Sequence, residues 1–129
     1  MKTASLTLSL AIWLTMIQFG SARAQNQAEG KNLYTTYCVT CHGDKGKGDG
    51  MAAKGLPAKP ADHTSGEVMN KLNDKFLIEV ISKGGGAVGK SSFMPSWGAA
   101  LSEKQIRNIV AYIRTIAVPP YKGEMPSNK

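Results

Sequence analysis

Two cysteines and a histidine stand close together in the run Cys38-Val39-Thr40-Cys41-His42. A C-x-x-C-H run is the attachment signature of a c-type haem. Cys38 and Cys41 lie near one face of a helical turn, from which both thiols can form thioethers with the vinyl groups of one porphyrin. His42 follows one turn after Cys38 on nearly the same face, where its imidazole can reach the iron. The motif therefore predicts one covalent haem c with His42 as the proximal iron ligand.

The same two cysteines, the only two in the chain, have other interpretations. A disulfide is common in exported proteins, but the loop between Cys38 and Cys41 is so short that it would constrain the unfolded chain weakly. A thioredoxin-like motif needs a βαβ setting, which the sequence does not predict. Zinc needs four ligands, and the second histidine, His63, is far from zinc-finger spacing. The haem interpretation remains the leading one.

The N-terminus has the organisation of a secretory signal peptide. Lys2 supplies positive charge, Leu6–Phe19 is an apolar run, and Ala22-Arg23-Ala24 is a small-x-small cleavage site. The run is short for a membrane span, which takes roughly 20 residues. We expect residues 1–24 to be the signal peptide, which places the mature protein in the periplasm without a membrane span. An uncleaved anchor is the alternative.

The chain of 129 residues is long enough for one domain, which we assign to residues 25–118. Residues 119–129 are expected to be an extended or disordered tail. The net charge of +7 is spread along the chain without a Lys/Arg block, so it does not indicate nucleic-acid binding. Such a charge is better suited to guiding the encounter with an acidic partner protein.

The hydrophobic periodicity predicts helices and no strand. Residues 28–41 are predicted to form a helix that leads into the motif and stops at Gly43. Residues 43–63 and 87–98, rich in turn-forming residues, are predicted to be loops. Twenty structureless residues in a compact domain are unusual, but a large flat cofactor gives such a loop something to wrap around.

Three further helices are predicted after the first loop. Thr64 to Glu67 reads as a capping box for a short helix that ends near residue 71. Asn73 or Asp74 caps the next helix, which Gly84 to Gly86 end. Ser102 to Gln105 forms a second capping box for the last helix, which ends at Pro119-Pro120. Its predicted buried face holds Ile106, Ile109, Val110, Ile113 and Ile116, and its predicted solvent face holds Lys104, Arg107, Asn108 and Arg114.

The chain resembles a class I cytochrome c of the small bacterial monohaem type. The resemblance rests on the C-x-x-C-H run, on Gly30 and Tyr34 before it, on the loop GDKGKGDG and on the Met-Pro pair before the last helix. In that family a glycine and an aromatic residue let the first helix cross the last one closely, here at Ile109 and Tyr112. The resemblance implies an all-α cytochrome c fold, with three to four helices and long loops wrapped around one covalent haem.

Met94 is the predicted distal iron ligand, because it lies in the loop just before the last helix, as the methionine ligands of that family do. Its thioether is a soft donor, and Met/His ligation raises the potential of a cytochrome c. Pro95 fixes the neighbouring backbone and would help to present the sulfur. The weaker candidates are Met51, Met69 (expected to be buried on a short helix), Met125 and His63 (expected to be a solvated loop residue).

Three residues, Leu56, Pro57 and Trp97, are predicted to line the haem pocket. The His42 ring should donate its free N–H to a backbone carbonyl, which the resemblance places at or just before a proline; Leu56-Pro57 is predicted, with Pro60 as the alternative. Trp97 is expected to pack on the haem or to donate to a propionate, unless it is an ordinary core residue. Further lining residues are expected to be Phe76, Leu77, Ile81, Phe93 and Leu101.

With both axial positions filled, no open iron site would remain for oxygen or peroxide. We therefore expect an electron carrier and not an enzyme: a periplasmic protein, with no catalytic residues, that moves one electron between unidentified respiratory partners. The alternative is a haem c subunit fixed in a larger periplasmic oxidoreductase complex. An enzyme or gas sensor would need an iron that Met94 leaves open. A docking rim, or an ordinary solvated surface, is predicted for Lys45, Lys47, Lys54, Lys59 and Lys90.

Overall fold

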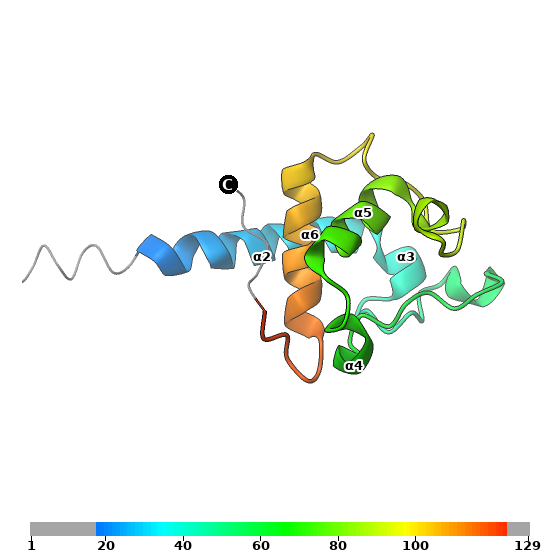
Figure 1. The fold of residues 1–129 in the computed structure, drawn as a ribbon, viewed down its shortest axis with the longest axis horizontal. Coiled ribbons are helices and arrows are strands. Elements are labelled where there is room, and N and C mark those ends of the chain that lie inside the picture. Colours follow the sequence, from blue (N-terminus) through cyan, green and yellow to red (C-terminus); the bar gives the residue numbers. More distant parts are fainter. Residues whose placement is uncertain (1–17, 124–129) are drawn as a thin grey trace, which may run out of the picture.

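The computed structural model describes residues 18–123, with side chains from residue 26 onward. The helices are α2 Gln18–Tyr37, α3 Val39–His42, α4 Gly66–Met69, α5 Asp74–Lys83 and α6 Glu103–Ile116, with 3₁₀ turns at Ala53–Gly55 and Gly85–Val88 (Figure 1). Within the described range the only β-pairing is one isolated parallel bridge between Ser65 and Val118. The predicted all-α fold is confirmed.

The first helix differs from its predicted bounds. It begins at Gln18, includes the predicted cleavage site, and ends at Tyr37, so that the motif starts a separate short helix. Residues 1–17 and 124–129, with most of the predicted signal peptide and with Met125, lie outside the described residues. Among residues 18–123, no helix is both long enough and apolar enough to cross a bilayer.

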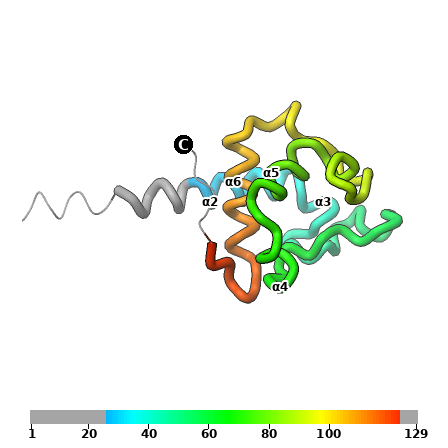
Figure 2. The backbone as a smooth tube through the Cα atoms, in the orientation of Figure 1, coloured from blue at the N-terminus to red at the C-terminus, as the bar shows by residue number. Residues whose placement is uncertain are grey.

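Helices α2 and α6 cross, as Figure 2 shows, and Gly30 of α2 lies at the contact with α6. A Cβ at Gly30 would overlap the carbonyl oxygen of Asn108 and lie 3.1 Å from the Cβ of Tyr112. One turn later, the ring of Tyr34 packs edge-on against the ring of Tyr112, with 5.2 Å between the centroids. Glycine is required here because any side chain would force the two backbones apart. The close crossing inferred from the resemblance is confirmed.

Helix α6 begins with the predicted capping box. The Ser102 hydroxyl accepts from the Gln105 N–H at 3.3 Å, and the Gln105 side chain accepts from the Ser102 N–H at 2.9 Å. The helix ends at Ile116, three residues before Pro119, because Ala117 already adopts an extended backbone. Of the predicted buried face, Ile106, Ile109, Val110 and Ile113 are buried and Ile116 is half-buried.

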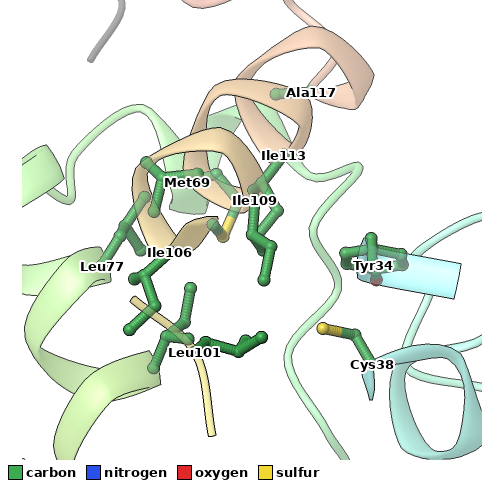
Figure 3. Close-up of a cluster of buried hydrophobic side chains, with 11 residues drawn as sticks. Tyr34, Cys38, Met69, Leu77, Leu101, Ile106, Ile109, Ile113 and Ala117 are labelled. Carbon is green, nitrogen blue, oxygen red and sulfur yellow. The ribbon is translucent and has the colours of Figure 1, made fainter. Parts of the chain in front are cut away.

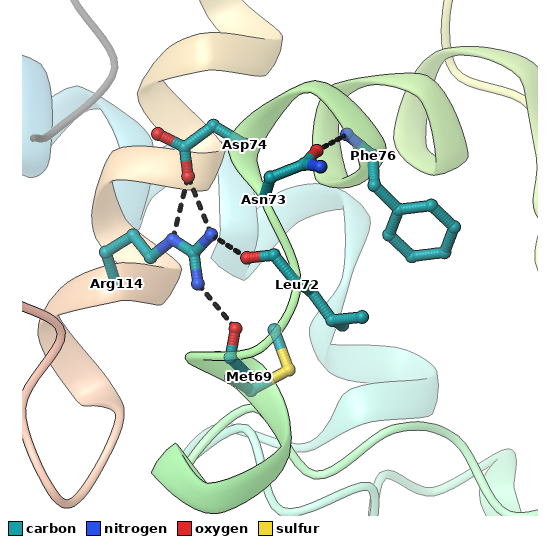
Figure 4. Close-up of polar contacts among 6 residues, drawn as sticks. All are labelled: Met69, Leu72, Asn73, Asp74, Phe76 and Arg114. Atoms are coloured by element: carbon teal, nitrogen blue, oxygen red, sulfur yellow. Dashed lines mark hydrogen bonds and ion pairs between the residues drawn. The ribbon is translucent and has the colours of Figure 1, made fainter. Parts of the chain in front are cut away.

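Two residues predicted on the solvent face of α6 are buried: Asn108 is 1% exposed and Arg114 is 2% exposed. The Arg114 guanidinium donates to Asp74 at 2.8 Å and to the carbonyls of Met69 and Leu72 at 2.6 and 2.5 Å (Figure 4). Asn108 donates to Glu29 on α2 at 2.7 Å. The prediction was wrong because helical periodicity cannot show partners that other elements bring to a polar side chain.

The N-cap predicted for α5 is confirmed, whereas the one predicted for α4 is not. Asn73 accepts from the Phe76 N–H at 2.8 Å and Gly84, at φ +84°, ends α5, as predicted. The capping box predicted for α4 is absent: the side chain of the N-cap, Ser65, makes no capping hydrogen bond, and Thr64 donates its hydroxyl to Asp62 at 2.6 Å. Instead, backbone hydrogen bonds to Val118 hold the start of α4.

The core gathers around α6. Figure 3 shows side chains from α4, α5 and α6 converging on one cluster, which Tyr34 of α2 and Cys38, directly after α2, both face. The Cys38 sulfur points toward the side of the cluster formed by Leu101 and Ile109. The fold thus places the first cysteine of the motif in its apolar core.

Candidate functional site

The C-x-x-C-H run sits on the tight junction between α2 and α3. The Cys38 N–H donates to the Tyr34 carbonyl at 2.9 Å, and the His42 N–H donates to the Cys38 carbonyl at 2.9 Å. Gly43, at φ +80°, ends α3 as predicted. His42 therefore lies one helical turn after Cys38, which is the arrangement that the spacing predicted.

Both cysteines are free thiols, so the disulfide alternative is not realised. Cys38 is buried, and burial, together with the nearby Cys41, raises the pKa of its thiol to about 12. A thiol that stays protonated at neutral pH is neither a reactive nucleophile nor a ready zinc ligand. Within residues 18–123, no group of three or more His, Cys, Asp or Glu side chains is placed to hold a metal ion.

His42 is buried, with its Nδ1 3.0 Å from the carbonyl oxygen of Ala61. A carbonyl only accepts, so Nδ1 carries the proton and Nε2 is the nitrogen that can bind a metal. Burial lowers the pKa of His42 and outweighs the opposite effect of the Ala61 hydrogen bond. The ring is therefore neutral, which is the form that ligates iron. The predicted acceptor at Leu56-Pro57 was wrong, and the actual one directly follows Pro60.

The glycine loop explains why the Pro60–Ala61 segment reaches His42. The Gly48 N–H donates to the His42 carbonyl at 2.8 Å, and the His63 N–H donates to the Gly46 carbonyl at 2.7 Å. Gly48 has φ +70°, and a Cβ there would overlap the carbonyl oxygen of Pro60. The loop therefore folds back on the motif and brings the returning chain against the His42 ring.

His63 is buried and not solvated, which corrects the prediction. Its ring stacks on that of His42, with 4.2 Å between the centroids and 17° between the planes. Its Nδ1 lies 3.0 Å from the hydroxyl oxygen of Tyr34. Burial, reinforced by His42, lowers the pKa of His63 to about 3, so the ring is neutral. Because the two rings lie face to face, His63 stands beside His42, the predicted proximal ligand, and not opposite it.

The sequence did not indicate Ala61 as a site residue, and it indicated His63 only as a weak candidate for the distal ligand. Ala61 acts through its backbone and leaves no side-chain signal. His63 is one of only two histidines in the chain, which was the available signal, but nothing in the spacing showed that the loop would return it to His42.

Met94 lies in the loop after the second 3₁₀ turn, half-buried against the core cluster. Its N–H donates to the Ser91 carbonyl at 3.1 Å, and its carbonyl accepts from the Gly85 N–H at 3.0 Å. Figure 1 shows this loop and the loop around residues 53–55 on the same side of the molecule as α3. Ligation by Met94 stays a prediction. Of the other candidates, Met51 is 91% exposed and Met69 is buried in α4, as expected for a core residue.

The predicted pocket residues differ in burial. Trp97 is half-buried and packs edge-on against Tyr37, with 5.1 Å between the ring centroids. Leu56 is half-buried, and Pro57 is exposed. Phe93, also expected to line the pocket, is 57% exposed. The roles of Leu56, Pro57 and Trp97 toward a haem stay predictions.

These residues fit a haem c. The site offers two free thiols one turn apart, a neutral imidazole whose Nε2 is not engaged by Ala61, and an apolar cluster that already contains Cys38. A flat apolar macrocycle held through two thioethers requires this combination, and a hydrogen-bonded carbonyl behind the ligand is the usual support of a metal-binding histidine.

The proteins to which this chain is similar are c-type cytochromes and subunits of cytochrome c oxidases. The family model described as "Cytochrome C oxidase, cbb3-type, subunit III" matches residues 25–113. Cytochrome c-554(547) of Halothiobacillus neapolitanus is 35% identical over 95 residues, which cover 72% of this chain and 99% of that protein. No solved structure matches the chain at a significant level.

Subunits of cbb3-type cytochrome c oxidases are also similar. Subunit FixP of Bradyrhizobium diazoefficiens is 32% identical over 95 residues, which cover 73% of this chain and 29% of that subunit. Subunit CcoP of Azospirillum sp. (strain B510) is 30% identical over 103 residues, which cover 74% of this chain and 30% of that subunit. The chain thus spans less than a third of the length of these oxidase subunits.

Proposed function

Because the chain belongs to the family described as cbb3-type cytochrome c oxidase subunit III, we propose that it is a periplasmic electron carrier with a single haem ligated by His42 and Met94. The chain is a c-type cytochrome with covalently bound haem c, and it functions in electron transfer. The finer elements of the proposal are the two axial ligands, the location and the absence of an enzymatic activity of its own.

One observation carries the assignment of the proximal ligand. His42 is buried, neutral and hydrogen-bonded through Nδ1 to Ala61, directly after two free thiols. Cys38 and Cys41 would hold the macrocycle, and the Ala61 carbonyl keeps the proton on Nδ1, so that Nε2 would be the nitrogen that binds the metal. When bound, the haem supplies an iron that accepts and releases one electron. His42 is only 8% exposed, which limits the access of water to its ring.

Met94 is proposed as the distal ligand because it is half-buried against the core in a loop with fixed backbone hydrogen bonds. A thioether in that place keeps small molecules from the iron, which favours electron transfer over oxygen or peroxide chemistry. The periplasmic location is supported by the expected signal peptide, and the family match begins at residue 25, directly after the expected cleavage site.

The test is the visible spectrum of the matured protein, recorded oxidised, reduced, and reduced under carbon monoxide. A low-spin c-type spectrum that carbon monoxide does not change supports the proposal. Met94→Ala should then produce a ferrous form that binds carbon monoxide, while Met51→Ala, a matched change at a 91% exposed methionine, should not. A wild-type protein that binds carbon monoxide readily would overturn the assignment of Met94.

A fixed subunit of a larger oxidoreductase complex is the second candidate. The similarity to the oxidase subunits FixP and CcoP favours it. The similarity to cytochrome c-554(547) favours a separate small protein, because the match covers 99% of that cytochrome. Size-exclusion chromatography of a native extract separates the two: haem absorbance at the size of the chain alone indicates a free carrier, and haem absorbance only in a large species indicates a subunit.

A further inference from the structure

The two histidines of the chain form one buried unit, and the proposed function uses only one of them. The His63 ring lies parallel to the ring of His42, with 4.2 Å between the centroids. The Tyr34 hydroxyl is 3.0 Å from Nδ1 of His63, and the Tyr34 ring meets the His63 ring edge-on at 5.8 Å. A buried polar side chain is costly unless it is hydrogen-bonded, and His63 has such a bond here.

The His42 ring can turn about its Cβ–Cγ bond, and the hydrogen bond from Nδ1 to Ala61 opposes this turn. One hydrogen bond still leaves a range of ring orientations, because it tolerates a spread of angles. A second flat ring stacked on its face opposes this rotation, provided that the second ring is itself held. The His63 backbone is held by its N–H, which donates to the Gly46 carbonyl at 2.7 Å, and the His63 ring is held by the hydrogen bond between its Nδ1 and the Tyr34 hydroxyl.

Tyr34 is in turn fixed by the crossing of α2 and α6. It is fully buried, and its ring packs against Tyr112 of α6 with 5.2 Å between the centroids. The contacts therefore form a continuous series from the helix crossing, through Tyr34 and His63, to His42. Each member restricts the orientation of the next.

We propose that His63 is a positioning residue for His42, locked by the Tyr34 hydroxyl, so that the helix crossing sets the plane of the proximal ligand. The inference rests on the proposed function, in which His42 ligates the iron. Loss of the stacked ring would let the His42 ring turn and lengthen its bond to Ala61. A weaker bond makes the imidazole a poorer donor, and a poorer donor stabilises ferric iron less, so the reduction potential would rise.

The experiment compares four variants of the matured holoprotein. His63→Leu removes the flat ring and its hydrogen bond, His63→Phe keeps a flat ring without the hydrogen bond, and Tyr34→Phe removes only the hydroxyl. Tyr112→Phe is the matched control, since it removes a hydroxyl from the same helix crossing without touching His63. The readouts are the midpoint potential and the spread of the haem methyl proton shifts in the oxidised protein, which follows the orientation of the axial ligands.

We expect His63→Leu to alter the methyl shift pattern and to raise the potential, changing the ferric-to-ferrous ratio at a fixed solution potential about threefold or more, where tenfold corresponds to 59 mV for one electron. His63→Phe and Tyr34→Phe should give smaller changes in the same direction, and Tyr112→Phe should match the wild type. If the His63→Leu protein does not acquire its haem, the methyl shifts and potentials of His63→Phe and Tyr34→Phe test the inference by themselves.

Wild-type shifts and potential in both His63 variants and in Tyr34→Phe would overturn the inference, as would equal changes in Tyr34→Phe and Tyr112→Phe. Failure of the proposed function has a different signature, because the wild-type protein would then lack a low-spin spectrum before any variant is compared. A purely structural role for His63 would lower thermal stability and leave the methyl shifts of the folded variant in place.

Discussion

The two sides of the proposed haem site are built differently. On the side of His42, three segments interlock: α3 with His42, the returning loop with Ala61 and His63, and α2 with Tyr34, which contacts His63. On the side of Met94, the loop is held by backbone hydrogen bonds, and the neighbouring Phe93 is 57% exposed. The proximal side is thus part of the core, and the distal side is a surface loop laid over it.

Because of this difference, the two sides should control different properties: global stability on the side of His42 and local opening of a loop on the side of Met94. Interlocked buried contacts fix an orientation and contribute to global stability, whereas a loop with few buried side chains can open locally at a low free-energy cost. Changes on the proximal side should therefore alter folding and reduction potential together. Changes on the distal side should alter ligand exchange at the iron and leave global stability nearly unchanged.

The largest expected effect is loss of the fold when the haem cannot attach. Cys38→Ala with Cys41→Ala removes both thioethers, and the cluster beside Cys38 would lose the apolar plate that completes a small core. We expect far-UV circular dichroism to show a large loss of helicity in the double variant. Thr40→Ala, an exposed position between the cysteines, is the control. Native-like helicity without haem would show that the proximal side is stable by itself.

The next largest effect is expected at the helix crossing. Gly30→Val would drive side-chain atoms into the Asn108 backbone, so we expect it to lower the free energy of unfolding by about 3 kcal/mol. Gly55→Val is the matched control, because no atom lies within 4 Å of a Cβ built there. Denaturant titrations of both holoproteins measure the difference. Equal stabilities would mean that the crossing does not support the proximal side.

A smaller, local effect is expected on the distal side. A Cβ at Gly85 would overlap the Ser91 carbonyl oxygen and lie 3.0 Å from the Cβ of Met94, whereas a Cβ at Gly86 would meet only Ser92, at 3.6 Å. Gly85→Ala should therefore displace the Met94 loop and let the ferrous protein bind carbon monoxide, with the unfolding midpoint nearly unchanged. Gly86→Ala should behave as the wild type. Unaltered carbon monoxide resistance in Gly85→Ala would contradict the picture of an easily displaced loop.

The features that could be predicted from the sequence are those that neighbouring residues determine. The Ser102 and Asn73 caps, the glycine stop at Gly43 and the motif geometry all depend on residues within one or two turns, and they are confirmed. The close approach at Gly30 is a long-range contact, and the family resemblance supplied it. Residues with partners in distant segments, namely Arg114, Asn108 and His63, were assigned to solvent because a pattern along one element carries no information about the element that packs on it.

The smallest effect is expected from exposed lysines, which would act only on the rate of electron transfer to a partner protein. Lys47 is exposed in the glycine loop that folds back on the motif, and Lys104 is exposed near the start of α6. If complementary charge guides an acidic partner to the exposed haem edge, Lys47→Glu should slow electron transfer to that partner a few-fold at low ionic strength, and the deficit should shrink as salt screens the charges. Lys104→Glu makes the same change in net charge, so it should slow the reaction less if position matters and equally if only net charge does. Stopped-flow rates at several ionic strengths distinguish these outcomes, and a wild-type rate that does not depend on salt would remove the charge-guided encounter altogether.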